Sequence, residues 1–268
     1  MTVIMWVALN AFRESVRDKV LYNLVAFAIL LMGASYLIGQ LTAGQDVKII
    51  KDLGLAATTI FGLFIAIFIG IGLVSKEVER RSIYGLLAKP VERYHLVLGK
   101  YGGLVITLAV NLAIMTAALY VVLAYMTYLT PAETRTAWDA PGLDPRMLKA
   151  IVLTFVELSI VTAIALCFST FSTPILSAAF TFGIFVAGRF SADLRNFNDV
   201  VDSNAAGALT RAVYWVLPNL AAFDVRSQVV HGQPVPLDYL ALTIGYGLLY
   251  ITALLATATL VFSRRDFK

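Results

Sequence analysis

Six apolar stretches of membrane-spanning character constrain this chain more than any other feature of its sequence. They run approximately over residues 20–40, 53–74, 101–128, 150–170, 174–190 and 238–262, and the fifth is the shortest. A helix that crosses a hydrocarbon core of about 30 Å needs about 20 apolar residues, because unpaired backbone groups are costly in lipid. The sequence therefore predicts an all-α integral membrane protein with six transmembrane helices, folded as a single domain over residues 1–268.

The overall composition agrees with this class and excludes an ordinary soluble enzyme. Of the residues, 59% are hydrophobic and only 14% are charged, whereas soluble domains carry about 25% charged residues. A single cysteine, Cys167, excludes an internal disulfide and a cysteine-based metal cluster. Two histidines, His95 and His231, leave little for a histidine-based site. We therefore expect no metal in this chain.

The distribution of basic residues predicts the orientation in the membrane. Six spans place both termini on one side, together with residues 75–100 and 171–173. Those segments, 1–19 and 263–268 included, hold 12 Lys and Arg, against nine in the longer outer loops 41–52, 129–149 and 189–237. Basic loops stay in the cytoplasm, so we expect both termini to be cytoplasmic. The net charge of +4 thus reflects topology, and we expect no nucleic-acid partner.

Residues 1–19 mix apolar and charged side chains, among them Trp6, Phe12, Arg13 and Arg17. This pattern favours a short interfacial helix lying on the inner surface of the membrane, in contact with its lipids. The alternative is a plain extension of the first span.

The stretch 75–100 carries the densest charge in the chain, yet it has apolar residues at helical spacing. Glu77 lies four residues before Arg81, which is the favourable order for a helical ion pair. Pro90 should end that helix, and a second short apolar face follows over residues 96–98. The pattern predicts a helix, a break and a second helix held between two spans. A solvated connection that only carries cytoplasmic charge is the alternative.

The run from Glu77 to Arg93, followed by Gly99-Lys100, resembles the first cytoplasmic loop of ABC transporter permeases of the type-2, exporter-like family. The closing residues 263–267, Ser-Arg-Arg-Asp-Phe, are similar to the end of these permeases after their last span. The subgroup that the chain most resembles is that of the permeases of multicopper-enzyme maturation. One departure is Ser82 where Thr is common, and that change keeps the hydroxyl group.

The resemblance implies a coupling helix between spans 2 and 3 that docks on a separate ABC ATP-binding subunit. It also implies two copies of that subunit, a second permease copy in a homodimer, and a bacterial or archaeal inner (cytoplasmic) membrane. Transport, which in this family is habitually export, would be driven by ATP with Mg²⁺ on the partner subunit, and no cofactor is expected in this chain. The residues that the resemblance implies as contacts of the ATPase are Glu77, Glu79, Arg80, Arg81, Tyr84, Leu87 and Arg93.

The chain itself lacks the motif for binding ATP. A P-loop needs a second glycine five residues before its Gly-Lys pair, followed by Ser or Thr, so that backbone amides can surround the phosphates. Here Gly99-Lys100 is preceded at that position by Tyr94 and followed by Tyr101. We therefore expect that this chain is not itself an enzyme and that the partner subunit hydrolyses ATP.

The longest segment outside the spans is residues 191–237. Its apolar middle is interrupted, so it is too broken to span and is expected to re-enter the outer leaflet or to lie along it. The resemblance implies that this external region helps to close the translocation path, with Arg211, Trp215 and Pro218 as candidate gate residues. A structural interfacial helix without a gating role is the alternative. A periplasmic accessory protein could contact the outer loop 129–149.

Glu157 lies inside the fourth span, where an ionisable side chain costs about 2.5–3.5 kcal/mol on insertion scales. Two functional hypotheses follow: it lines a polar translocation path, or it pairs with Arg189 near the outer end of the fifth span. The alternative is a carboxyl group that is protonated or hydrogen-bonded within the bundle.

Three functions remain after these exclusions. The first is the permease subunit of an ATP-driven transporter. The second is a non-transporting mechanotransmitter in which the same coupling acts on a periplasmic partner. The third is an ion-driven secondary transporter, which is disfavoured because no internal repeat is evident and only one intramembrane carboxyl is available.

Overall fold

The computed structural model describes residues 3–40, 46–79, 93–136, 138, 140–191 and 217–264. These residues form helices and short connections, with no β-strand among them, as the sequence predicts. Five of the helices are long and apolar enough to cross a membrane. They are α2 (Lys19–Gln40), α3 (Asp46–Glu79), α5 (Arg93–Leu129), α7 (Met147–Ser169) and α12 (Leu237–Arg264).

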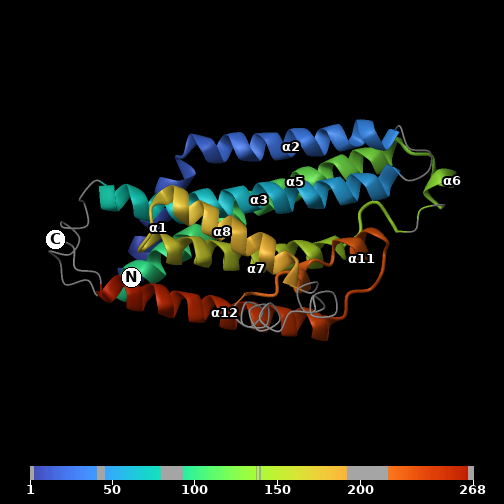
Figure 1. Cartoon of the computed structure of the whole chain (residues 1–268). Coiled ribbons are helices and arrows are strands. Elements are labelled where there is room, and N and C mark those ends of the chain that lie inside the picture. Colours follow the sequence, from blue (N-terminus) through green and yellow to red (C-terminus); the bar gives the residue numbers. More distant parts are fainter. Residues whose placement is uncertain are drawn as a thin grey trace, which may run out of the picture.

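The fifth predicted span forms the shorter helix α8 (Pro174–Arg189), which ends one residue before the predicted boundary. Its 16 residues give about 24 Å of helix, less than a hydrocarbon core of about 30 Å. Figure 1 shows α8 running beside only part of the length of the bundle. The six-span count therefore stays a prediction, because α8 needs further chain to complete a crossing.

Helix α7 is the central element of the bundle. It packs against α3, α5, α8 and α12, and every side chain from Val156 to Cys167 is buried. A helix that is apolar on all sides suits either a protein interior or surrounding lipid. The contacts with four other helices, rather than the apolar sequence alone, place α7 at the centre.

Small residues set the distance between α3 and α7. A Cβ atom on Gly62 would collide with the Leu158 side chain, and one on Gly70 would lie 2.7 Å from the Cβ of Ala165. Only the missing side chains of these two glycines permit this close approach of the helices. Gly72 differs, since a Cβ there would meet nothing within 4 Å.

The N-terminal residues form a separate helix, α1 (Val3–Val16), which is not a continuation of α2. The chain turns at Arg17 and Asp18, and the Asp18 carboxylate accepts a hydrogen bond from the Val20 amide at 3.0 Å. Helix α1 packs against the start of α5. A Cβ on Gly99 would lie 2.6 Å from the Cβ of Val7, so this glycine is needed for the contact.

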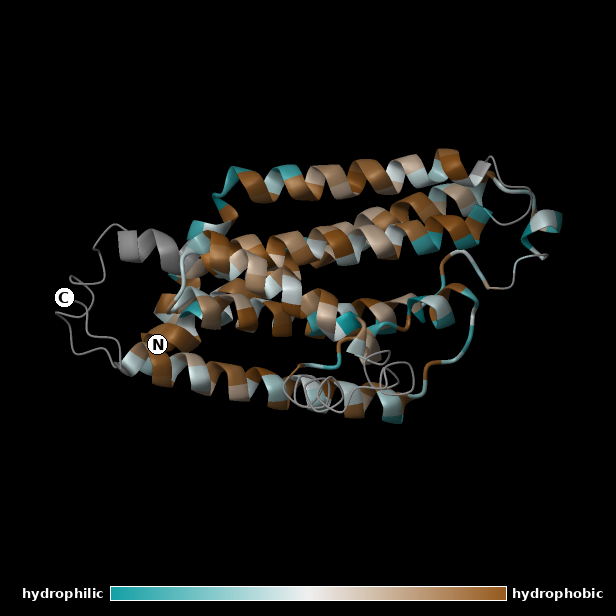
Figure 2. Cartoon of the chain, viewed as in Figure 1, coloured by the Kyte–Doolittle hydropathy of each residue, from teal (hydrophilic) through white to brown (hydrophobic). Residues whose placement is uncertain are grey.

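The bundle has two polar ends, as the hydropathy colouring in Figure 2 shows. We call one the α1 end, where α1, the last residues of α3 and α12 and the first residues of α5 lie (Figure 1). We call the other the α11 end, where the last residues of α2, the first residues of α3, α6 (Ala132–Arg135) and α11 (Arg226–Val230) lie. A short 3-10 helix, η2 (Ala221–Phe223), precedes α11.

The close contact between α3 and α7 gives a testable prediction. We expect Gly70→Val to destabilise the protein by about 1–3 kcal/mol, because the added methyl groups must displace the buried backbone of α7. Gly72→Val, two residues along the same helix, is the matched control, since that position is open. Thermal unfolding of both variants in detergent measures the difference, and equal melting temperatures would contradict the packing described for α3.

Candidate functional site

The most unusual polar group of the bundle is Glu157, at the centre of α7. It lies ten residues after Met147 and twelve before Ser169, or about 15 Å along the helix axis from its start. Its side chain is 0% exposed. A carboxylate at this depth needs a partner, because the desolvation of an isolated charge costs several kcal/mol. That cost is on the order of the whole free energy of unfolding of a protein.

The partner of Glu157 is Arg189, the last residue of α8. The Nε atom of Arg189 lies 2.8 Å from Oε1 of Glu157, and its Nη2 donates a hydrogen bond to Oε2 at 2.9 Å. This two-point contact matches the planar guanidinium to the planar carboxylate. The pairing that the sequence suggested is thus present in the structure, while a role in a translocation path remains a hypothesis.

A third charged residue, Asp224, completes the network. Nη1 of Arg189 donates to its carboxylate, and the ring of Phe185 lies 5.5 Å below the guanidinium. Asp224 also accepts a hydrogen bond from the Arg226 amide at 3.2 Å, so its position is fixed locally. The network therefore joins α7, the end of α8 and the segment between η2 and α11.

Sequence reasoning missed Asp224, which is 35 residues from Arg189 along the chain. The sequence did hold one indication. An arginine guanidinium has five N–H donors, and one carboxylate such as Glu157 uses only part of them. A second acceptor was therefore to be expected, but periodicity could not say which other carboxylate supplies it.

Residues 217–225 fill the part of the bundle that α8 leaves unoccupied. The Leu220 amide donates to the Gly188 carbonyl at 3.1 Å, and the Asn219 amide donates to the Tyr246 hydroxyl at 2.9 Å. Leu220 and Phe223 are buried. Backbone without helical hydrogen bonds is tolerated at membrane depth only inside protein, and this segment has protein contacts from α8 and α12.

Of the three predicted gate residues, the structure places one. Pro218 is buried, and its carbonyl oxygen lies so close to the end of α8 that a Cβ on Gly188 would be 2.7 Å from it. Arg211 and Trp215 lie outside the described residues. Pro218 is therefore positioned beside the Arg189 network, as a structural part of the same junction.

Charged side chains also attach residues 226–236 to α3 and to the start of α7. These contacts use long basic side chains that reach backbone carbonyls or a carboxylate of another element. They join Arg226 Nε to Asp52 Oδ1 at 3.1 Å, Arg146 Nη1 to the Gly232 carbonyl at 2.5 Å, and Lys149 Nζ to the Val235 carbonyl at 2.7 Å.

Helices enter the predicted coupling loop from both sides. Helix α3 continues through Glu77 to Glu79, and α5 already begins at Arg93. The apolar residues 96–98, predicted as a separate short helix, belong to α5. No proline interrupts either helix, and α3 continues beyond its apolar spanning window, which ends at Gly72. The other expected contacts, Arg80, Arg81, Tyr84 and Leu87, lie outside the described residues.

The described residues contain no group of three His, Cys, Asp or Glu side chains close enough to hold a metal ion. What the described residues of the site offer is an electrostatic attachment between the central helix α7, the end of α8 and the segment between η2 and α11.

Comparison with known proteins agrees with the membrane character of the chain. A family model described as ABC-2 family transporter protein matches residues 5–267. No curated protein matches the chain.

The ion pair gives a second prediction, which takes the form of a double-mutant cycle. Arg189→Met leaves Glu157 without its main partner, and loss of one member of a buried pair costs about 3–5 kcal/mol. The combined variant Glu157→Gln, Arg189→Met should recover most of that loss, because no unpaired charge remains. Unfolding free energies in detergent are compared for Glu157→Gln, Arg189→Met and the double variant. A loss in the double variant equal to the sum of the two single losses would contradict a direct pairing.

Proposed function

The chain belongs to the ABC-2 family of transporter proteins, and on this premise we propose that it is the permease subunit of an ATP-driven ABC transporter. The family match carries the proposal, because it covers residues 5–267 and with them all the helices of spanning length. In this proposal, two copies of the chain form a homodimer, and two copies of a separate ABC subunit bind ATP and Mg²⁺.

The proposed contact with the ATPase lies between the extended ends of α3 and α5. Glu77, Glu79 and Arg93 would contribute from these helices, and Arg80, Arg81, Tyr84 and Leu87 from the chain between them. Both helices are continuous to the α11 end, with 34 residues in α3 and 37 in α5. Movement at their α1 ends would therefore reach α7, which packs against both helices.

The proposed topology puts the α1 end in the cytoplasm of a bacterial or archaeal cell and the α11 end outside its inner membrane. The excess of Lys and Arg in the segments of the α1 end supports this orientation. Six crossings result if α8 and residues 217–225 together make the fifth crossing and α12 makes the sixth. The backbone hydrogen bonds of Leu220 to α8 and of Asn219 to α12 support such a composite element.

We propose that the Glu157–Arg189–Asp224 network keeps the outer side of this composite element closed. Arg189 holds two elements at once, since it contacts α7 through Glu157 and the outer segment through Asp224. A shift of α7 relative to α8 would have to change one of these contacts. ATP-driven movement could thus open the outer segment, and export is the direction that we propose.

A second candidate is a mechanotransmitter that acts on an external accessory protein, as the resemblance to multicopper-maturation permeases suggests. The observation that favours it is an open groove at the α11 end, between α2, α3 and α11. Lys48, Asp52, Arg226 and His231 give this groove charged and polar walls. An ion-driven transporter is less well supported, because Arg189 already neutralises the buried Glu157.

Substitutions at the proposed ATPase contact test the function directly. In the complex with its ATPase, we expect Glu79→Lys, Arg81→Glu and Leu86→Pro each to reduce stimulated ATP turnover by about tenfold or more. Such a loss corresponds to about 1.4 kcal/mol of coupling energy. Membrane insertion should remain normal, since these positions lie beyond the spanning windows.

Arg135→Glu provides the control, because Arg135 is exposed in α6 at the opposite end of the bundle. Its charge reversal should leave turnover unchanged. Normal ATPase association and normal stimulated turnover in all three loop variants would show that this region is not the coupling element.

A further inference from the structure

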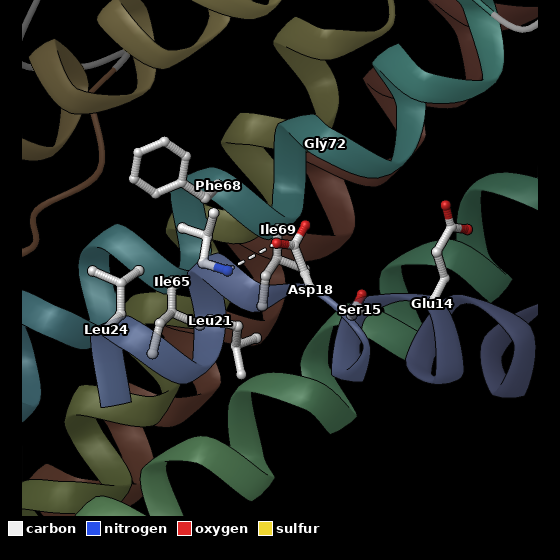
Figure 3. Close-up of a pocket in the computed structure, with 10 residues that line it drawn as sticks. Glu14, Ser15, Asp18, Leu21, Leu24, Ile65, Phe68, Ile69 and Gly72 are labelled. Atoms are coloured by element: carbon white, nitrogen blue, oxygen red, sulfur yellow. Dashed lines mark hydrogen bonds between the residues drawn. The ribbon is translucent and has the colours of Figure 1, made fainter. Parts of the chain in front are cut away.

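A cavity of about 200 Å³ lies at the elbow between α1 and α2, against α3. In Figure 3 the side chains of Glu14, Ser15 and Asp18 rise from one side of the elbow toward the part of α3 that carries Ile69 and Gly72. The cavity is too small for a drug-sized ligand, whose pockets start at about 300 Å³. It can hold a small polar group with a chain that continues outside.

The polar wall of this cavity consists of acceptors. Ser15 is 5% exposed, and its hydroxyl, which lines the cavity, has no hydrogen-bond partner. Glu14 forms no ion pair with another described residue. The Asp18 carboxylate is already engaged, because it caps α2 through the Val20 amide. The acceptors of this wall that can take a ligand are therefore the carboxylate of Glu14 and the unpaired, buried hydroxyl of Ser15. Both suit a ligand that is cationic and donates hydrogen bonds.

The opposite wall is apolar and leads away from the elbow. Leu21 and Leu24 of α2 and Ile65 and Phe68 of α3 line it. From Phe68, the exposed apolar side chains of Phe64 and Ile60 follow at four-residue spacing along the same face of α3. This stripe extends for about 12 Å. An acyl chain that leaves the cavity would find a continuous apolar track.

The level of the cavity in the membrane fits a lipid head group. The spanning window of α2 begins at Lys19, and that of α3 ends at Gly72, so the elbow lies where hydrocarbon meets the head groups. The neighbouring side chains of Arg13, Arg17 and Lys19 are exposed and do not line the cavity. Positive charge therefore lies outside the cavity and negative charge inside it, which complements a head group with a phosphate and a terminal cation.

From this arrangement we propose that the α1–α2 elbow binds one molecule of phosphatidylethanolamine. Its ammonium group enters the cavity and donates to Glu14 and Ser15. Its phosphate faces the exposed basic side chains, and one acyl chain follows Phe68, Phe64 and Ile60. An ammonium carries N–H donors for these two acceptors, whereas the trimethylammonium of phosphatidylcholine has none and is recognised by aromatic cages.

Native mass spectrometry of the delipidated protein in detergent tests this assignment. The probes are phosphatidylethanolamine, its mono- and dimethylated forms and phosphatidylcholine, all with the same acyl chains. We expect retention to fall with each methyl group and to be about tenfold lower for phosphatidylcholine, as the loss of charge-assisted hydrogen bonds requires. Equal retention of all four lipids overturns the proposal.

Variants then locate the site. Glu14→Gln combined with Ser15→Ala should remove the preference for phosphatidylethanolamine, while Glu133→Gln in exposed α6 should keep it. If the first variant fails to fold, Gly72→Phe offers a second route, because it fills the cavity from a position where a side chain has open space. An unchanged preference in a folded cavity variant would place the lipid elsewhere and overturn the assignment.

Discussion

The attachment of Arg189 to Glu157 is the interaction on which the architecture of this bundle depends. Helix α7 is buried from Val156 to Cys167, so a charge at its centre has no access to bulk water. Arg189 neutralises that charge from the end of α8 and at the same time binds Asp224. The last residue of α8 thus lies at the depth of Glu157, at the centre of α7. Residues 217–225 then fill the remaining space.

Two long helices connect this central network with the opposite end of the molecule. Helices α3 and α5 both pack against α7 and both extend to the region proposed to contact an ATPase. Helix α1 is held close to the start of α5 through Gly99, and a Cβ on Gly103 would collide with the Ala8 carbonyl oxygen. The α1–α2 elbow is therefore mechanically attached to the proposed coupling region. A lipid bound at the elbow would contact the same assembly.

The sequence predicted much of this fold because membrane burial imposes long apolar runs. The helical class, the five long helices and the bounds of α8 follow from those runs, and the cost of a buried carboxylate pointed from Glu157 to Arg189. Other features depend on contacts between distant residues, which periodicity does not record. Asp224 could not be chosen among the outer carboxylates. The docking of α1 on α5 depends on the missing side chain of Gly99, which periodicity does not single out. The helix predicted around Glu77 is continuous with the span before it, since α3 runs to Glu79.

Isolation of the intact complex from its own membranes tests the proposed function most directly. The chain would carry a tag, and the subunits that remain bound after mild solubilisation would be identified and counted by native mass spectrometry. We expect two copies of the chain together with two copies of a subunit that contains a Walker motif. Recovery of a stable assembly of the chain without any nucleotide-binding subunit would contradict its role as the permease of an ATP-driven transporter.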